Sequence, residues 1–247
     1  MFQVSIIMPY FKKKKFVENS IKSILNQTYQ NFQVIIVDDE LSIESSEVLK
    51  KIHRLDNRIK IINNPRNLGA GESRNIGIEI ASGEFIAFCD CDDLWKESKL
   101  EKQIKFMKKM ECDLSFTAYE IVDESGLKIG SRKAKDILIF NDLLKSCDIG
   151  LSTVILKKEL FKNIYYKFAN LKTKEDYVLW LKMVQDGKIC RGLNECLSSW
   201  RKSKNSLSSS VLQKLEDGFQ IYRVYLKYSI FKSLICLFVL SINSILR

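Results

Sequence analysis

The sequence contains a single histidine and no pair of cysteines at CxxC spacing, and both absences limit the metal chemistry that it supports. His53 lies in a charged helical stretch, where a surface position is expected because zinc sites need several convergent ligands. The 7 cysteines are scattered along the chain, so buried reduced thiols are expected rather than disulfides. A metal centre built on cysteine or histidine is therefore not predicted.

Long hydrophobic runs are also missing from the chain. The uninterrupted apolar stretch of the tail, 234–240, is much shorter than the ~20 residues that a membrane-spanning helix needs. Residues 1–10 form a strand-like run with no basic region before it and no small-residue cleavage site after it. No secretory signal is recognised, and a cytoplasmic location is expected.

What the chain does contain is enough apolar sequence for one large folded domain. Of its 247 residues, 46% are hydrophobic and 28% are charged, which is ordinary for a globular protein. The formal net charge of +10 favours an anionic partner, such as a nucleotide, a nucleic acid or an acidic membrane surface. No nucleic-acid-binding motif is found and the lysines are not gathered in one strip, so no nucleic-acid partner is predicted.

The first half of the chain alternates apolar runs with amphipathic stretches. Continuous β-branched runs of this kind are typical of parallel strands that helices cover on both faces. The alternation predicts an open, mostly parallel α/β sheet flanked by helices, with ligands at the carboxyl ends of the strands. Strands are predicted at 4–10, 32–39, 59–62 and 84–90, and helices at 16–29, 43–55 and 71–82.

From about residue 96 the pattern becomes α+β. A helix that begins near Thr173 is apolar nearly all round, as a buried helix is. We predict one domain over 1–210, divided into a nucleotide-binding half (1–95) and a second half (96–210), and a helical tail over 211–247. Within the second half we expect a helix at 96–110, a hairpin at 113–130, a short helix at 140–147 and a strand at 152–156.

The tail at 219–247 places Arg223, Lys227, Lys232 and Arg247 among aromatic and aliphatic residues. A basic amphipathic helix of this kind is suited to lie in the plane of an anionic membrane surface. The alternative is a helix packed on the domain or on a second subunit of a homodimer. Both interpretations stay open from the sequence.

Acidic residues follow two of the predicted strands. Asp38 and Asp39 end one, and Asp90, Asp92 and Asp93 end another, in the stretch FCDCDD. Two carboxylates at i and i+2 of an extended segment project to one side of the chain, and oxygen ligands suit Mg²⁺ or Mn²⁺ bound with a phosphate. The alternative is that Asp92 or Asp93 only caps the helix that follows.

The turn-rich loop at 64–77 lies between these two groups of acids. Its Gly69-x-Gly71 pair is followed by Arg74 where a dinucleotide fingerprint has its third glycine. We therefore reject a dinucleotide-binding fold.

Taken together and in order, these segments resemble the family-2 inverting glycosyltransferases, which have a single nucleotide-sugar-binding domain of the GT-A type. The resemblance implies a Rossmann-like nucleotide-binding half, an α+β acceptor half and a divalent metal, Mn²⁺ or Mg²⁺. It also implies a UDP-sugar donor and a saccharide or lipid-linked acceptor in cell-surface glycan assembly. The basic amphipathic tail fits an acceptor presented at the inner face of the cytoplasmic membrane. The QxxRW signature of processive members is absent, so a polymerising synthase is not expected. The matching stretches are 4–42, 67–95, 173–183 and 199–208.

The resemblance implies nucleotide-binding roles for residues in the first half. Pro9 and Tyr10 end the first strand where the nucleotide of the family lies. Asp39, or else Asp38, matches the acid that reads the uracil edge. Arg74 matches an arginine near the base.

The resemblance also assigns the acids of FCDCDD and the segment SWRKSKNSLS. Asp90 matches the residue beside the ribose, Asp92 the residue that binds the metal, and Asp93 a supporting acid. Arg201 and Ser206 belong to the segment that folds over the donor, where Arg201 is the candidate cation for the leaving diphosphate.

Asp176 has two interpretations. Thr173 and Asp176 have the spacing of a capping box, which would make the acid a structural residue. The resemblance instead matches Asp176 to the catalytic base, which takes the proton of the acceptor hydroxyl. Adjacent Glu175 is expected to point elsewhere, because neighbours on a helix differ by about 100°. We predict Asp176 as the base and Glu175 as a secondary residue.

Two other classes of function compete with this prediction. A nucleotidyltransferase that makes a nucleotide-sugar uses a similar sheet, but it needs a glycine-rich basic loop after the first strand, where this chain has PYFKKKKF. A non-catalytic basic protein that binds membrane surfaces would keep its function when Asp92 and Asp176 are replaced by asparagine.

Overall fold

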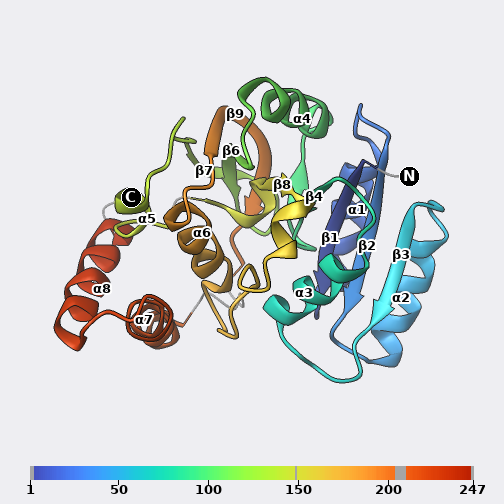
Figure 1. Cartoon of the computed structure of the whole chain (residues 1–247). Helices are drawn as coiled ribbons and strands as arrows, with labels where there is room; N and C mark the ends of the chain where they lie inside the picture. Colours follow the sequence, from blue (N-terminus) through green and yellow to red (C-terminus); the bar gives the residue numbers. More distant parts are fainter. Residues whose placement is uncertain (1–2, 148, 204–209, 246–247) are drawn as a thin grey trace.

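The computed structural model describes residues 3–147, 149–203 and 210–245. A 9-stranded sheet runs through the described chain in the order β3-β2-β1-β4-β8-β6-β9-β5, with β7 paired to β6 (Figure 1). The strands are β1 (Val4–Tyr10), β2 (Phe32–Asp38), β3 (Ile59–Asn63), β4 (Phe85–Phe88), β5 (Leu94–Trp95), β6 (Leu114–Val122), β7 (Lys128–Arg132), β8 (Ile155–Lys157) and β9 (Cys190–Arg201). The helices are α1 (Lys14–Leu25), α2 (Ile43–His53), α3 (Ala70–Ile80), α4 (Lys99–Met110), α5 (Phe140–Leu143), α6 (Glu175–Gln185), α7 (Val211–Gln220) and α8 (Ile230–Ile245).

The sheet is parallel in its first half and mixed in its second. Strand β1 pairs in parallel with β2 and β4, and β2 pairs in parallel with β3. Strand β8 is antiparallel to both β4 and β6, whereas β9 runs parallel to β6 and antiparallel to β5. The predicted parallel α/β half is confirmed, and its strands end at one edge of the sheet.

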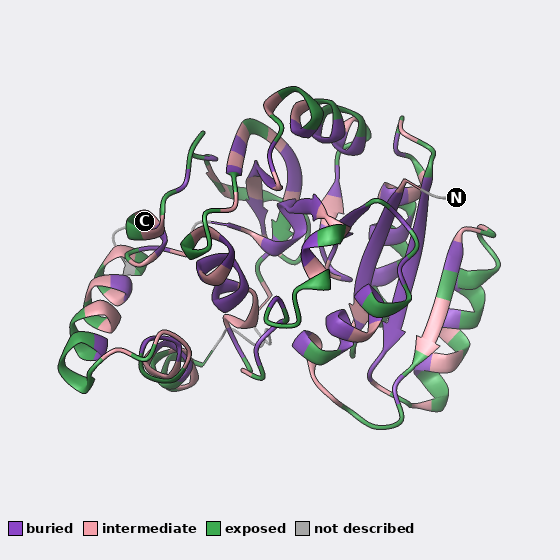
Figure 2. Cartoon of the chain, viewed as in Figure 1, coloured by how far each residue is buried: buried purple, intermediate pink, exposed green. Residues whose placement is uncertain are grey.

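Two apolar layers cover the sheet, one on each face. Alternate residues of β1 point to opposite layers: Ile6 packs with the layer that includes α1, α2 and α4, and Ile7 with the layer that includes α3 and α6. Figure 2 shows β1 and β2 buried along nearly their whole length. Full burial of an aliphatic side chain contributes roughly 1.5–3 kcal/mol, so these layers hold the edge of the sheet in a fixed place.

The second half differs from the sequence prediction in one boundary that matters for the site. Helix α4 begins at Lys99 instead of residue 96, because Leu94 and Trp95 form β5 and pair with Ser199 and Ser198 of β9. This pairing ties the acidic loop before β5 to the last strand of the sheet. The predicted hairpin, the short helix and the strand near 152–156 are present with shifted ends.

The tail packs on the domain through α7 and the π-helical turn Ile221–Tyr225. Ile221 and Tyr222 are fully buried, and the Tyr222 hydroxyl donates a hydrogen bond of 2.8 Å to the carbonyl of Leu144. Asp217 of α7 accepts hydrogen bonds from the backbone and the hydroxyl of Thr173. Within the described ranges, no helix has both the length and the apolar character needed to cross a membrane.

Candidate active site

A cavity of about 390 Å³ lies where the loop after β4 meets the N-terminal end of α6. Its wall includes acids from both segments and an arginine from α3. These residues are Arg74, Asp90, Asp93, Glu175 and Asp176. The structure therefore brings together five of the residues that the sequence analysis singled out.

Arg74 joins three segments that are far apart in the chain. Its side chain is 4% exposed, donates 2.8 Å from Nη2 to Oδ1 of Asp90, and forms a second ion pair from Nη1 to Glu175. The guanidinium also lies over the ring of Phe168, 5.4 Å from its centroid. Arg74 thus fixes the acidic loop and the start of α6 against α3.

A glycine allows α6 to approach α3 this closely. A Cβ atom on Gly71 would lie 3.2 Å from Cγ of Glu175 and 3.0 Å from the carbonyl oxygen of Ala169. A larger residue would push the Glu175 side chain away from its position beside Arg74. Gly71 is therefore a packing glycine of the site, not part of a dinucleotide fingerprint.

Asp176 is partly buried on the wall of the cavity. Burial, followed by the negative charge of Glu175, raises the pKa of Asp176 from 3.8 to about 7, against the lowering effect of Arg74. A carboxyl with a pKa near neutrality is suited to accept a proton under physiological conditions.

The structure excludes the capping-box alternative at the start of α6 and overturns the expectation for Glu175. The capping box is not formed, because the hydroxyl of Thr173 donates to Asp217 and the N-cap position is Lys174, which makes no side-chain cap bond. Glu175 does not point away from Asp176: both line the cavity, because the ion pair with Arg74 holds the Glu175 carboxylate there.

The acidic loop forms a turn, whereas an extended segment was expected. The amide of Asp93 donates 3.1 Å to the carbonyl of Asp90. The carboxylates of Asp90 and Asp92 consequently pair with different cations: Asp90 with Arg74, and Asp92 with Lys13 at 2.5 Å from Oδ2 to Nζ. Among the cavity-lining residues are Asp90 and Asp93 but not Asp92.

Neither Asp92 nor Asp93 caps α4, which begins after Ser98. The Asp93 carboxylate is buried and accepts hydrogen bonds from the Ser152 hydroxyl and, at 2.9 Å, from the amide of Arg201. Burial raises the pKa of Asp93 well above its ordinary value. Asp93 therefore stabilises the turn through these hydrogen bonds to Ser152 and Arg201.

The carboxylate oxygens of this loop suit a divalent cation that is bound by only one or two protein side chains. The Asp92 carboxylate forms an ion pair with the Lys13 ammonium, so it lies where a positive charge can bind. Across the described residues, no cluster of three or more His, Cys, Asp or Glu side chains is arranged to hold a metal. One or two carboxylates with water and phosphate oxygens are the ordinary ligands of Mg²⁺ in phosphate chemistry.

Asp38 and Asp39 are both buried beside the ends of β1 and β2. The Asp39 carboxylate accepts hydrogen bonds from the amides of Leu68 and Gly69, at 2.7 and 2.9 Å. Gly69 has φ +86, a left-handed conformation that favours glycine. Asp38 accepts from the hydroxyl of Ser45. These acids shape the loops after β2 and β3, and their predicted contact with uracil stays a prediction.

Pro9 and Tyr10 end β1 next to the acidic loop, and the thiol of Cys91 lies 3.2 Å from the carbonyl of Pro9. Cys91 is buried, as is Cys89, so the two cysteines of FCDCDD face the core. The nucleotide-binding role of Pro9 and Tyr10 stays a prediction.

Arg201 lies behind the acidic loop. Its Nε donates 3.0 Å to the carbonyl of Asp92, and its Nη1 donates to the carbonyls of Asp123 and Glu124. These bonds connect the acidic loop to β9 and to the β6–β7 turn. The predicted contact of Arg201 with the diphosphate stays a prediction, and Ser206 lies outside the described residues.

Sequence reasoning missed two partners of the acids. Ser152 lies on a 3₁₀ turn, where its hydroxyl accepts from the amide of Asp90 at 3.0 Å and donates to Asp93. No sequence signal marks this serine. Lys13 was noted only as one of four consecutive lysines, and its contact with Asp92 needs the fold.

Comparisons with known proteins identify the family of the chain. Residues 5–167 match the family model described as "Glycosyl transferase family 2". TuaG of Bacillus subtilis (strain 168), a glycosyltransferase named for teichuronic acid biosynthesis, is 34% identical over 89% of this chain and 87% of its own length. WfgD of Escherichia coli, named UDP-Glc:alpha-D-GlcNAc-diphosphoundecaprenol beta-1,3-glucosyltransferase, is 36% identical over 89% of this chain and 85% of its own length.

A solved structure shows the same fold. S. aureus TarS 1-349 in complex with UDP-GlcNAc superposes with a TM-score of 0.74 at 20% identity, covering 96% of this chain and 70% of that one. The predicted architecture, an α/β sheet of the GT-A type flanked by helices, is confirmed. The chain belongs to glycosyl transferase family 2 and is an enzyme of sugar transfer with the GT-A fold.

Proposed function

We propose that this enzyme transfers a sugar from a UDP-sugar to a lipid-linked saccharide acceptor, with inversion at the anomeric carbon, in cell-surface glycan synthesis. One observation carries the proposal: Asp176, a carboxyl with a pKa raised to about 7, shares a cavity with Asp90 of the acidic loop. The name of WfgD supports the acceptor class, and the name of TuaG, which refers to teichuronic acid biosynthesis, supports the role in cell-surface glycan synthesis. The UDP-GlcNAc complex of TarS supports the donor class.

Asp176 is the proposed general base. The acceptor hydroxyl oxygen attacks the anomeric carbon, the bond from that carbon to the diphosphate oxygen breaks, and the hydroxyl proton passes to the Asp176 carboxylate. Arg74 holds Glu175 and Asp90 on either side, so the negative charge around Asp176 is partly balanced. This balance keeps the pKa of Asp176 from rising further.

Asp92 is the proposed ligand of a divalent cation, with Asp90 nearby and Asp93 holding the turn. A bound Mg²⁺ or Mn²⁺ would neutralise the charge that develops on the leaving diphosphate. Family membership favours this function over a nucleotidyltransferase and over a non-catalytic membrane-binding protein. The basic tail supports a location at the inner face of the cytoplasmic membrane.

UDP release tests this proposal directly. We expect the purified protein to release UDP from a UDP-sugar only when Mn²⁺ or Mg²⁺ is present, and Asp92→Asn to lower the rate by about 100-fold or more. Asp136→Asn is the matched control, because the Asp136 side chain is 70% exposed and does not line the cavity. Full activity of Asp92→Asn would remove Asp92 from the metal site, and diphosphate released from a nucleoside triphosphate would favour the nucleotidyltransferase.

Replacement of Lys13 is expected to strengthen metal binding. The Lys13 ammonium contacts the same carboxylate that we assign to the cation, so the two positive charges compete for Asp92. Lys13→Met should therefore lower the Kd for Mn²⁺ by about three- to tenfold, as the loss of one partly exposed ion pair would. Electron paramagnetic resonance of free Mn²⁺ measures this Kd.

Lys14→Met is the control for this experiment. Lys14 pairs with Glu44 on the surface, where both side chains are more than half exposed. An unchanged or weaker Mn²⁺ affinity in Lys13→Met would show that Lys13 does not compete with the metal.

A further inference from the structure

Helix α8 presents two different apolar faces. The inner face packs on the domain through Ser233, Cys236, Leu237 and Leu240, of which Ser233 and Leu240 are almost completely buried. The outer face repeats at helical spacing and stays in solvent. Its members are Phe231 (74% exposed), Leu234 (51%), Ile235 (49%), Phe238 (66%) and Ile242 (38%).

The inner face of α8 also reaches the active-site cavity. Leu240 and Ser244 line the same cavity as Asp90 and Asp176. The end of the helix is held by Asn243, whose Nδ2 donates 2.8 Å to the carbonyl of Lys145. Figure 1 shows α8 at the side of the molecule opposite β3, with its C-terminal end beside α5. Helix α8 thus presents an apolar face to solvent and also forms part of the wall of the active-site cavity.

The positive charge of the tail favours an anionic lipid surface as the partner of the outer face. Residues 219–247 contain four basic residues and no Asp or Glu. A second protein copy would meet the same positive charge on both sides, whereas an anionic lipid surface complements it. An exposed apolar row flanked by positive charge is the pattern of a helix that lies in a bilayer interface.

Two cations on the cavity wall have no carboxylate partner among the residues that the structure describes. Arg132 of β7 and Lys174 line the cavity, and neither forms an ion pair with any residue that the structure describes. Lys174 has φ +61, a left-handed conformation that is uncommon for lysine and clusters at functional sites. The Lys174 ammonium lies over the ring of Tyr177, 6.0 Å from its centroid, and Arg132 Nη1 donates to the carbonyl of Ser131, so both residues add positive charge to the cavity wall.

We propose that the outer face of α8 lies on an anionic bilayer and that the cavity receives a membrane-anchored sugar diphosphate as acceptor, with Arg132 and Lys174 binding the acceptor diphosphate. This inference rests on the proposed function and adds the residues that recognise the acceptor. The sugar lies toward Asp176, and the lipid chain leaves the cavity along Leu240 and Ser244 into the bilayer. Docking of α8 thus brings the cavity to the membrane surface.

Vesicle sedimentation of the full chain tests the bilayer contact. We expect the wild type to bind phosphatidylglycerol vesicles at least about tenfold more strongly than phosphatidylcholine vesicles. The double variant Phe231→Ser, Phe238→Ser should lose at least about tenfold of this binding, because two exposed rings no longer enter the interface. Ile164→Ser is the control, since Ile164 is 72% exposed and far from the tail in sequence. Equal binding to both lipids, or full binding by the double variant, would overturn the bilayer contact.

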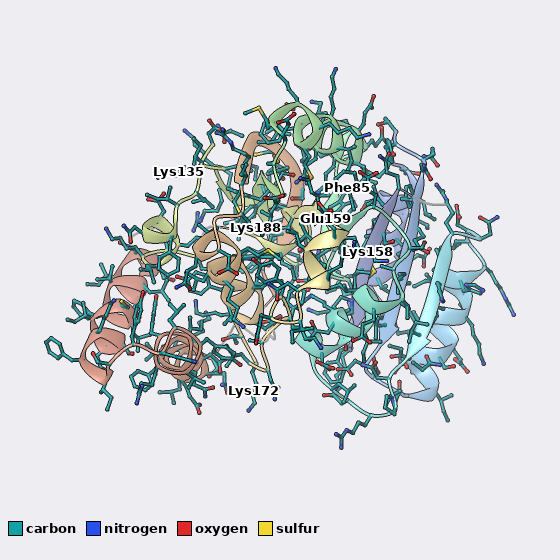
Figure 3. The ribbon with its side chains drawn as sticks, viewed as in Figure 1. Phe85, Lys135, Lys158, Glu159, Lys172 and Lys188 are labelled. Carbon is teal, nitrogen blue, oxygen red and sulfur yellow. The ribbon has the colours of Figure 1, made fainter. Side chains whose placement is uncertain are left out.

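Calorimetric binding in detergent tests the diphosphate contact. The probes are an N-acetylglucosaminyl diphosphoryl alkyl lipid and the matching alkyl glycoside without the diphosphate. Lys174→Gly suits the left-handed backbone, and Arg132→Gln removes the other cation; each should raise the Kd of the diphosphate probe by about tenfold and leave the glycoside unchanged. Lys172→Gln is the control, because Lys172, labelled in Figure 3, is exposed and does not line the cavity.

The outcomes separate this inference from the proposed function. No binding of the diphosphate probe, or an equal loss for both probes, would overturn the assignment of Arg132 and Lys174. A raised Kd for UDP in these variants would assign the cations to the donor instead, which also overturns it. Absence of UDP release by a wild type that binds the diphosphate probe would contradict the proposed function and not the acceptor site.

Discussion

Asp176→Asn is expected to lower turnover by about 10²–10⁴-fold while the protein stays folded. Asparagine keeps the shape of the side chain but cannot accept the proton of the acceptor hydroxyl. UDP release in the presence of acceptor, donor and Mn²⁺ measures the loss. Asp136→Asn serves again as the surface control. Activity close to the wild type would remove Asp176 as the base.

The same substitution should stabilise the folded protein at mildly alkaline pH. The pKa of Asp176 is about 7 in the folded state and 3.8 in the ordinary state. Between these values the folded carboxyl holds a proton that the unfolded chain has lost, so the stability contributed by this group falls as pH rises through that window. Above it, the buried charge is a cost that asparagine removes.

The expected gain is on the order of 1–2 kcal/mol. Each pKa unit corresponds to about 1.4 kcal/mol, but Asp176 is partly exposed, so solvent reduces the full value. Urea unfolding on both sides of pH 7 measures the difference between variant and wild type. A variant that is both inactive and less stable at alkaline pH would indicate a structural role for Asp176.

The turnover rate of the wild type should depend on pH through the ionisation of Asp176. A base must be ionised to accept a proton, so the rate should fall tenfold per pH unit below a pKa of about 7 and be level above it. The residual rate of Asp176→Asn should not show this fall at acidic pH. A wild-type profile that is level down to the ordinary range of aspartic acid would contradict the raised pKa.

The sequence predicted the part of the fold that local patterns determine. Continuous apolar runs and helical spacing located β1 to β4 and α1 to α3, because covered parallel strands and amphipathic helices each have a distinct period. The acids at the ends of β2 and β4 were found for the same reason. From residue 94 onward, the strands β5, β8 and β9 pair across long separations in the chain, and no local period reports such pairing.

The site was predicted as a set of residues but not as a set of contacts. Arg74 and Glu175 are 101 positions apart, and neither carries a local signal for their ion pair. The turn at Asp90 depends on Ser152, which belongs to a segment that the sequence analysis treated as a strand. Charge, spacing and resemblance select candidate residues, whereas tertiary packing decides which cation each acid meets.

The tail shows how one pattern supports two interpretations. Its residues are apolar on nearly every side, and a sequence pattern alone does not separate the side that packs on the domain from the side that faces out. Burial of Ile221, Tyr222 and Leu240 identifies the inner side, and exposure of Phe231 and Phe238 identifies the outer one. The packing interpretation therefore concerns the inner side, whereas the membrane interpretation concerns the outer side and stays a proposal.

Arg74→Met is expected to destabilise the protein by about 3–5 kcal/mol. The Arg74 side chain is 4% exposed and is the cation that pairs with both Asp90 and Glu175. Methionine fills much of the same volume but leaves these carboxylates, with Asp176 beside them, as uncompensated negative charge in a partly buried place. Urea unfolding at neutral pH measures the loss. Arg191→Met is the control, and it should cost less than about 1 kcal/mol because its partner Asp136 is 70% exposed.

A second substitution separates the charge of Arg74 from its packing. If the cost arises from unpaired carboxylates, Glu175→Gln introduced into Arg74→Met should restore part of the lost stability, because it removes one of the stranded charges. Arg74 also lowers the pKa of Asp176, so Arg74→Met should move the acidic limb of the rate profile above pH 7. No recovery in the double variant, together with an unmoved limb, would mean that Arg74 acts through packing against Phe168 and not through its charge.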